Sequence, residues 1–311
     1  MLTSDIDMRD AFFDEVYNLG EQDRNVIFLT DDMDAFSLIR FKADMPNQFF
    51  NINVAEQNMI NLATGLALCG KKVFVYGIAS FVTMRCFEQI KVNLGSLNLP
   101  VTIIGVGPGF SFEFDGPTHH ATQDVAMMRT IPEVTIYNLS DISLAARAAH
   151  LAYHSSGPVY VRLDKGKFPI LSDELEDFSQ GFRVLKPLQD INIVSTGYMT
   201  PQALMIANEL DKRLVRVGVV DLYRLKPIDP VFFHQVLDQS QEVITLEESS
   251  YVGGLGSSVC EILADYGGDA KVRRFASDDK QFLSYGHREW FHTLNSLDIT
   301  SVTNAIAQVP E

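Results

Sequence analysis

The sequence predicts an α/β protein of two domains, each built on a mostly parallel β-sheet with helices on both faces. Short apolar segments typical of buried strands alternate with segments of helical periodicity along most of the 311 residues, and this pattern indicates βαβ units. The alternation lapses once, in a polar stretch over residues 166–190 that contains two prolines, and then resumes. We therefore expect domains over residues 1–170 and 191–311, joined by a linker over residues 171–190.

In the first domain, helices and strands are expected to alternate. Residues 6–19 carry apolar side chains at helical spacing, and a second such helix follows Asn53, its expected N-cap, and ends near Gly70. Further helices are expected over residues 81–94 and 141–154, with a short one after the Gly/Pro-rich loop at residues 107–118. The expected strands are residues 26–29, 73–76, 101–106, 134–137 and 159–163.

The second domain repeats the alternation on a smaller scale. Its expected strands are residues 191–195, 215–220, 242–248 and 271–275. Helices are expected after Thr200-Pro201 and after Asp229-Pro230, because Pro is favoured in the first turn of a helix. A third helix is expected to begin at the GGLG turn at residues 253–256.

Composition excludes several classes of protein. The formal net charge is −15, from 40 acidic and 25 basic residues, and such a field repels nucleic acid and anionic membranes. The three cysteines, Cys69, Cys86 and Cys260, are far apart, which argues against a zinc site or a disulfide framework. The N-terminus is acidic and no apolar run approaches the length of a membrane span. We therefore expect a cytoplasmic protein.

Five segments, taken in order, resemble the C-terminal half of the transketolase family. They are NVAEQNMINLATGLAL (53–68), GIASFVTMRCFEQIKV (77–92), FDGPTHHATQDVAMMRTIPEVTIY (114–137), VYVRLDKGKFPIL (159–171) and EESSYVGGLGSSV (247–259). The resemblance implies a pyrimidine-binding domain with the thiamine-diphosphate-binding fold, followed by a transketolase C-terminal domain. It also implies transfer of a two-carbon ketol unit from a ketose to an aldose, with thiamine diphosphate and Mg²⁺ as cofactors.

The resemblance assigns residues to activation of the cofactor. Alone, Glu56 is an ordinary first-turn acid that interacts well with the helix dipole. In the family, the matching carboxyl group hydrogen-bonds N1′ of the aminopyrimidine and promotes loss of the thiazolium C2 proton. Phe81 matches the ring that stacks on the aminopyrimidine, and Ile78 replaces a further family Phe. Asp32 matches an acid beside the thiazolium, whereas Arg85 is interpreted as structural.

The resemblance also assigns residues to the substrate. Asp115 and His119 match family residues that recognise substrate hydroxyl and carbonyl groups, and His titrates near neutrality, which suits proton transfer. His120 replaces a family Gln beside them. Arg162 matches an arginine that binds the acceptor phosphate, with a structural salt bridge as the alternative. The family's phosphate-contacting Ser falls at Phe36, next to Ser37, so the substrate sugar is not specified.

The family's diphosphate-binding GDG motif is absent from the sequence. The resemblance therefore implies a separately encoded subunit whose partner carries GDG and holds Mg²⁺ and the diphosphate. We expect a core dimer of this chain flanked by two partner subunits, a heterotetramer. The glycines of the GGLG turn are interpreted as turn and helix-packing residues.

Three alternatives remain open from the sequence. One is acyl transfer from pyruvate, as in 1-deoxyxylulose-5-phosphate synthase, and another is the β subunit of a 2-oxo acid dehydrogenase, against which the DGPTH segment argues. The third is a non-catalytic regulatory or assembly paralogue, against which Glu56, Phe81 and His119 argue.

Overall fold

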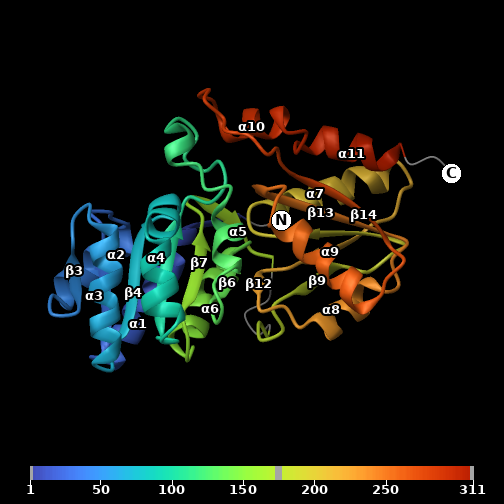
Figure 1. The fold of residues 1–311 in the computed structure, drawn as a ribbon. Coiled ribbons are helices and arrows are strands. Elements are labelled where there is room, and N and C mark those ends of the chain that lie inside the picture. Colours follow the sequence, from blue (N-terminus) through green and yellow to red (C-terminus); the bar gives the residue numbers. More distant parts are fainter. Residues whose placement is uncertain (1–2, 172–176, 309–311) are drawn as a thin grey trace. The chain divides into compact units, whose positions relative to one another are not determined.

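A computed structural model describes residues 3–171 and 177–308 of the chain (Figure 1). The chain divides into two compact units. Unit 1 comprises Met1–Pro108 and Met127–Glu176, and unit 2 comprises Gly109–Ala126 and Asp177–Glu311. The segment from Gly109 to Ala126 therefore packs with the second half of the chain although it lies within the first half of the sequence.

Unit 1 is built on a parallel sheet whose strands run in the order β6-β7-β5-β4-β2-β3. The strands are β2 (Val26–Thr30), β3 (Phe49–Asn51), β4 (Lys72–Ile78), β5 (Val101–Val106), β6 (Thr135–Asn138) and β7 (Val159–Leu163). Residues of β2, β5 and β7 are buried along the whole strand, as expected for a sheet covered on both faces. A separate antiparallel pair joins β1 (Thr3–Asp7) to β8 (Lys167–Pro169).

Helices cover both faces of this sheet (Figure 1). On one face, α1 (Met8–Gln22) packs against α2 (Phe36–Asp44) and α6 (Ile142–Tyr153). On the other, α3 (Glu56–Leu68) packs against a helical stretch composed of η1 (Phe81–Arg85), α4 (Phe87–Gln89) and η2 (Ile90–Gly95). Both η1 and η2 are π-helical, a form that occurs frequently at functional sites.

The strand order fixes where a ligand crevice can form in unit 1. From β2 the chain passes through α2 to β3 on one side, and then returns through α3 to β4 on the other side of β2. The direction of winding therefore reverses between β2 and β4. In open α/β sheets, ligands bind beyond the carboxyl ends of the strands at such a reversal. The residues that follow Thr30 and Ile78 lie at this point.

Unit 2 has a second sheet, in the order β14-β13-β10-β11-β9, in which only β9 runs antiparallel to its neighbour. Its strands are β9 (Arg183–Lys186), β10 (Ile191–Ser195), β11 (Gly218–Asp221), β13 (Glu242–Ser250) and β14 (Lys271–Ser277), and a short strand, β12, spans Arg224–Lys226. Its helices are α7 (Met199–Lys212), α8 (Pro230–Leu237), α9 (Leu255–Tyr266), α10 (Arg288–Leu294) and α11 (Ile299–Ala307). The Gly109–Ala126 segment adds the short helix η3 (Gly116–Thr118), and α5 (Asp124–Arg129) crosses the sequence boundary between the units.

The predicted fold class is confirmed, and three local expectations are corrected. Asn53 is not the N-cap of α3: it has a φ of 57°, and the cap is Ala55, without a side-chain hydrogen bond. The expected linker contains strand β9, and β8 precedes it, because both strands pair with segments distant in sequence. Residues 172–176 of that linker lie outside the described residues. Finally, the helix expected over residues 81–94 is largely π-helical rather than α-helical.

Candidate active site

Glu56, predicted to lie in the first turn of a helix, is the first residue of α3, and its side chain is only 3% exposed. Its Oε1 accepts a hydrogen bond from Nη1 of Arg85 at 2.6 Å. The guanidinium carbon of Arg85 lies 4.2 Å from the centroid of the Phe81 ring, and Nε2 of Gln57 donates to the Arg85 carbonyl oxygen at 3.0 Å. The structure thus brings together Glu56 and Phe81, with Arg85 connecting them.

Asp31 lies directly after β2, at the winding reversal, and is 6% exposed. Its backbone N–H donates to the Tyr76 carbonyl oxygen of β4 at 3.3 Å. A Cβ on Gly77 of β4 would collide with Oδ2 of Asp31, so the glycine makes room for this carboxyl group. Burial, followed by the charge of Glu56, raises the pKa of Asp31 to about 7.

Asp32, the residue predicted to lie beside the cofactor, is exposed and has a φ of 71°. It forms two hydrogen bonds with Asn51 at the end of β3: the Asn51 amide donates to Oδ1 at 2.8 Å, and the Asp32 N–H donates to the Asn51 Oδ1 at 3.0 Å. Ile78 ends β4 and is half-buried. Both residues therefore lie at the carboxyl ends of strands, where the crevice is expected.

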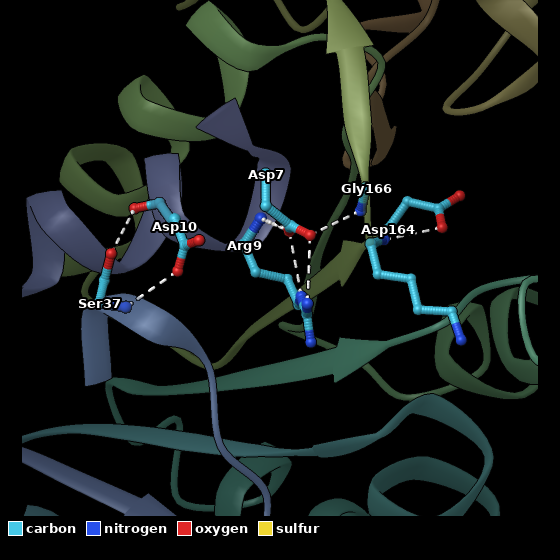
Figure 2. A network of polar contacts seen from close by, with 7 residues as sticks. Asp7, Arg9, Asp10, Ser37, Asp164 and Gly166 are labelled. Carbon is cyan, nitrogen blue, oxygen red and sulfur yellow. Dashed lines mark hydrogen bonds and ion pairs between the residues drawn. The ribbon is translucent and has the colours of Figure 1, made fainter. Parts of the chain in front are cut away.

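The position at which the family has a phosphate-contacting Ser is not suited to that contact here. Phe36 is 81% exposed, and the adjacent Ser37 is buried. The Ser37 N–H donates to Oδ1 of Asp10 at 2.9 Å, and its hydroxyl contacts the Asp10 carbonyl oxygen at 3.5 Å (Figure 2). Ser37 therefore joins α2 to α1. In the same view, Asp7 caps α1 and accepts a hydrogen bond from the N–H of Gly166 at 2.8 Å.

Asp115 and His119 lie on the Gly109–Ala126 segment of unit 2. Reciprocal backbone hydrogen bonds of 3.0 Å between Gly109 and Ala121 close its base. At its tip Gly116 has a φ of 72°, a conformation that favours glycine, and Asp115 is exposed beside it. His119 is half-buried, with Nδ1 2.9 Å from the Thr118 hydroxyl. The two side chains therefore project from a short, well-defined turn, as predicted.

Glu113 anchors this loop within unit 2. Oε1 of Glu113 accepts a hydrogen bond from the backbone N–H of Arg288 at 3.1 Å, and Oε2 lies 3.1 Å from Nδ1 of His287. Arg288 in turn donates to both carboxylate oxygens of buried Glu248, at 2.7 and 2.5 Å. Burial alone would raise the pKa of Glu248, but Arg288 and His292 hold it well below its usual range.

His120, predicted to bind substrate, is 4% exposed and lies edge-on to Phe110 and Phe291, with ring centroids 5.3 and 4.9 Å away. These two rings form a buried cluster with Phe282, and burial lowers the pKa of His120. This position favours a packing role in which the His120 ring stabilises the loop. A substrate contact by His120 stays a prediction to which the geometry gives no support.

Arg162, predicted to bind a phosphate, lies within β7 and is 2% exposed. This burial favours the alternative of a structural ion pair. The exposed cations of this segment are Lys165 and Lys167, beyond the end of β7.

The GGLG turn is filled by a side chain of the protein itself. The N–H groups of Leu255 and Gly256, at the start of α9, donate to the two carboxylate oxygens of Glu247, each at 2.7 Å. A Cβ on Gly254 would collide with the same carboxylate. The helix N-terminus that a phosphate would use is therefore occupied, which agrees with the expected turn and packing role.

Among the described residues, no three His, Cys, Asp or Glu side chains cluster in a way that could hold a metal ion. No helix in the described part of the chain has the length and apolar character needed to cross a membrane.

Sequence reasoning missed Asp31 and the role of Arg85. Arg85 is 29 positions from Glu56 in the sequence, so no local pattern links the two. Asp31 follows an apolar strand and belongs to a run of acidic residues, which is typical of a polar loop. The only signal for either is the strand order, which places the ends of β2 and β4 beside the start of α3.

Comparison with known proteins agrees with the architecture. Residues 4–170 match the transketolase pyrimidine-binding domain, and residues 181–295 match the transketolase C-terminal domain. The 6-deoxy-6-sulfo-D-fructose transketolase subunit SqwH of Clostridium sp. (strain MSTE9) is 32% identical over 83% of this chain and 81% of its own length. An apulose-4-phosphate transketolase subunit of Phocaeicola vulgatus is 31% identical over 85% of this chain and 86% of its own. A solved split-gene transketolase, an inactive beta4 tetramer, is 30% identical and superposes over 97% of both chains with a TM-score of 0.88.

Proposed function

The chain belongs to the transketolase family, and we propose that it is the subunit that activates thiamine diphosphate in a two-subunit enzyme transferring a ketol unit from a ketose to an aldose. The observation that carries this proposal is the buried Glu56 at the start of α3, which is hydrogen-bonded to Arg85, whose guanidinium group in turn lies over the Phe81 ring. Relatives of similar length are themselves subunits of transketolases.

The residues at this point fit the aminopyrimidine part of the cofactor. Glu56 offers a carboxyl group for a ring nitrogen, and it lies in a buried setting where a hydrogen bond is stronger than in water. The Phe81 ring and the side chain of Ile78 offer apolar surface for a flat heteroaromatic ring. Bound there, thiamine diphosphate would supply the electron sink for cleavage of the donor's C2–C3 bond.

The loop of unit 2 supplies groups suited to a sugar. Asp115 accepts hydrogen bonds and is exposed, so it can bind a substrate hydroxyl group. The ring nitrogens of His119 can donate and accept hydrogen bonds. The anchor formed by Glu113 and the backbone of Arg288 holds this turn in place, which reduces the entropy lost when a substrate is positioned.

We propose that a partner subunit holds the diphosphate and Mg²⁺. The glycine-rich helix start of this chain is closed by Glu247, and the sequence has no GDG motif. A core dimer of this chain flanked by two partners is the proposed assembly. The identity of the donor sugar is left to experiment, because the phosphate-binding position of the family is Phe36 in this chain.

The test is reconstitution of the chain with a co-encoded partner that carries GDG and a downstream Asn. We expect the complex to bind thiamine diphosphate with Mg²⁺, measured by calorimetry, and to transfer two carbons from a ketose rather than an acyl group from pyruvate. Glu56→Gln should abolish turnover with an unchanged melting temperature. Glu88→Gln, at an exposed acid of α4, is the matched control and should be fully active.

Two outcomes contradict the proposal. Full activity of Glu56→Gln would remove the assigned role and favour a non-catalytic paralogue. Turnover with pyruvate but with no ketose would favour the acyl-transfer alternative.

A further inference from the structure

A cavity of about 400 Å³ opens in unit 1 at the end of the sheet opposite to the winding reversal. Thr135 and Val159, the first residues of β6 and β7, line one side of it, and the second half of α6 with Ser155 and Ser156 lines the other. The strands from β6 to β3 run parallel, so this cavity lies a full strand length from the crevice expected beyond their carboxyl ends. Its size falls within the range of about 300–1,000 Å³ that is typical of small-ligand pockets.

The lining of this cavity is basic. Arg147, His150 and His154 line it from α6 and its C-cap, at positions that share one face of a helix, and the described lining residues include no Asp or Glu. Such a lining is unexpected in a chain with 40 acidic and 25 basic residues. Glu15 of α1 lies 2.8 Å from Nε2 of His150, so that imidazole already has an acidic partner.

The remaining polar side chains of the lining are available to a ligand. Arg147, His154 and Ser156 are exposed, and their side chains form no hydrogen bond or ion pair within the part of the chain that the structure describes. The His154 ring packs edge-on against the Tyr153 ring, with centroids 4.9 Å apart, and this contact leaves its nitrogens free to bond. A guanidinium group, an imidazole and a hydroxyl group are all hydrogen-bond donors. The cavity therefore presents several donors without acceptors.

The end of α6 accounts for only part of this positive charge. The helix ends at Tyr153, and basic residues in the last turn offset the partial negative charge of the final carbonyl groups. His150 and the C-cap His154 lie where that effect acts, whereas Arg147 lies before the last turn, beyond which the effect fades. The same helix end disfavours an anion, so an anion bound here would depend on the cationic side chains.

We propose that this cavity binds a phosphate group, either as inorganic phosphate or as part of a small phosphate ester. The planar guanidinium fork of Arg147 matches two phosphate oxygens. The His154 ring and the Ser156 hydroxyl group can donate hydrogen bonds to the other oxygens. A phosphate monoester carries about −1.5 to −2 charge at pH 7, and no carboxylate among the described lining residues repels it. This site is separate from the proposed catalytic role of the chain and does not rest on it.

The test is calorimetric titration of the full chain at pH 7 with inorganic phosphate, with glycerol 3-phosphate and with glycerol. We expect one or both phosphates to bind and glycerol not to bind. Arg147→Gln should weaken this binding about tenfold to a hundredfold, the effect of losing a hydrogen bond between charged groups. Arg216→Gln, at an exposed arginine of unit 2, is the matched control and should bind as the unmodified chain does. Binding of glycerol 3-phosphate alone would identify an ester as the ligand, and equal binding of both would show that the phosphate group suffices.

Several results would overturn the inference. One is the absence of binding by either phosphate at millimolar concentration, and another is equal affinity of the unmodified chain and Arg147→Gln. Equal weakening in Arg147→Gln and Arg216→Gln would indicate a general effect of net charge. Lower melting temperatures of Arg147→Gln and His154→Gln without ligand, together with unchanged phosphate binding, would assign these cations to the helix end. None of these results bears on the proposed function, which depends on the Glu56→Gln comparison.

Discussion

Replacement of Arg288 by Met should destabilise unit 2 strongly. Arg288 is buried and donates two hydrogen bonds to Glu248, and its guanidinium carbon lies 3.5 Å from the centroid of the Tyr198 ring. Met retains much of the side-chain volume but leaves the buried Glu248 charge with His292 alone. Removal of one partner from a buried ion pair costs about 3–5 kcal/mol. In a domain of this size each kcal/mol lowers the melting temperature by about 2–4 °C, so we expect a fall of roughly 6–20 °C.

The single tryptophan of the chain makes this measurable. Trp290 lies in α10, two residues from Arg288, so its fluorescence during urea unfolding reports on unit 2. The double variant Glu248→Leu/Arg288→Met removes both charges and should recover much of the lost stability. Because the pKa of Glu248 is lowered in the folded chain, the stability that the pair contributes is present above about pH 4.5 and is lost as the pH falls. The gap between the unmodified chain and Arg288→Met should therefore narrow in acid. A cost below about 1 kcal/mol, or a double variant no more stable than the single one, would refute this reasoning.

Three further predictions follow from close contacts. A methyl group on Gly77 would collide with Oδ2 of Asp31, so Gly77→Ala should lower the free energy of unfolding in urea by about 1–3 kcal/mol. The control, Gly65→Ala, is in open space on α3 and should be neutral or stabilising. Glu247→Ala leaves the two N–H groups at the start of α9 unpaired and should lower the free energy of unfolding by about 1–3 kcal/mol. Inorganic phosphate at millimolar concentration should restore part of this stability, and no restoration would mean that the turn collapses in the variant. Burial raises the pKa of the Cys86 thiol to about 12, so iodoacetamide at pH 8 should modify the exposed Cys69 and leave Cys86 unmodified. Mass spectrometry measures the labelling of each cysteine, and rapid labelling of Cys86 would contradict this prediction.

The strands were the most predictable part of the fold. The predicted segments at residues 101–106 and 159–163 agree with β5 and β7 as observed, because a strand buried on both faces is a continuous apolar run. Strands β1 and β8 were missed, since Thr3–Asp7 is largely polar and its pairing depends on a segment about 160 residues away.

The candidate site was predictable only where one residue carries the signal. Glu56 stands at a helix start that periodicity reveals, and the turn with Asp115 and His119 is marked by Gly116-Pro117. Its supporting contacts are long-range: Arg85 with Glu56, and Glu113 with the start of α10. No local pattern encodes such pairs. Conversely, His120 and Arg162 have residue types suited to binding, but their burial favours a packing role for His120 and a structural ion pair for Arg162.

The π-helical turn of η1 makes the length of its segment as important as its composition. One residue advances an α-helix by about 100°, and a π-helical turn accommodates an additional residue within a helix. Deletion of a single residue between Phe81 and Arg85 would advance Arg85 by one position along the helix, which turns its side chain by about 100°. The guanidinium group would then no longer be directed at Glu56, to which it is now hydrogen-bonded. Relatives that differ in length by one residue here should therefore differ in how this carboxyl group is held, even where every flanking residue is identical.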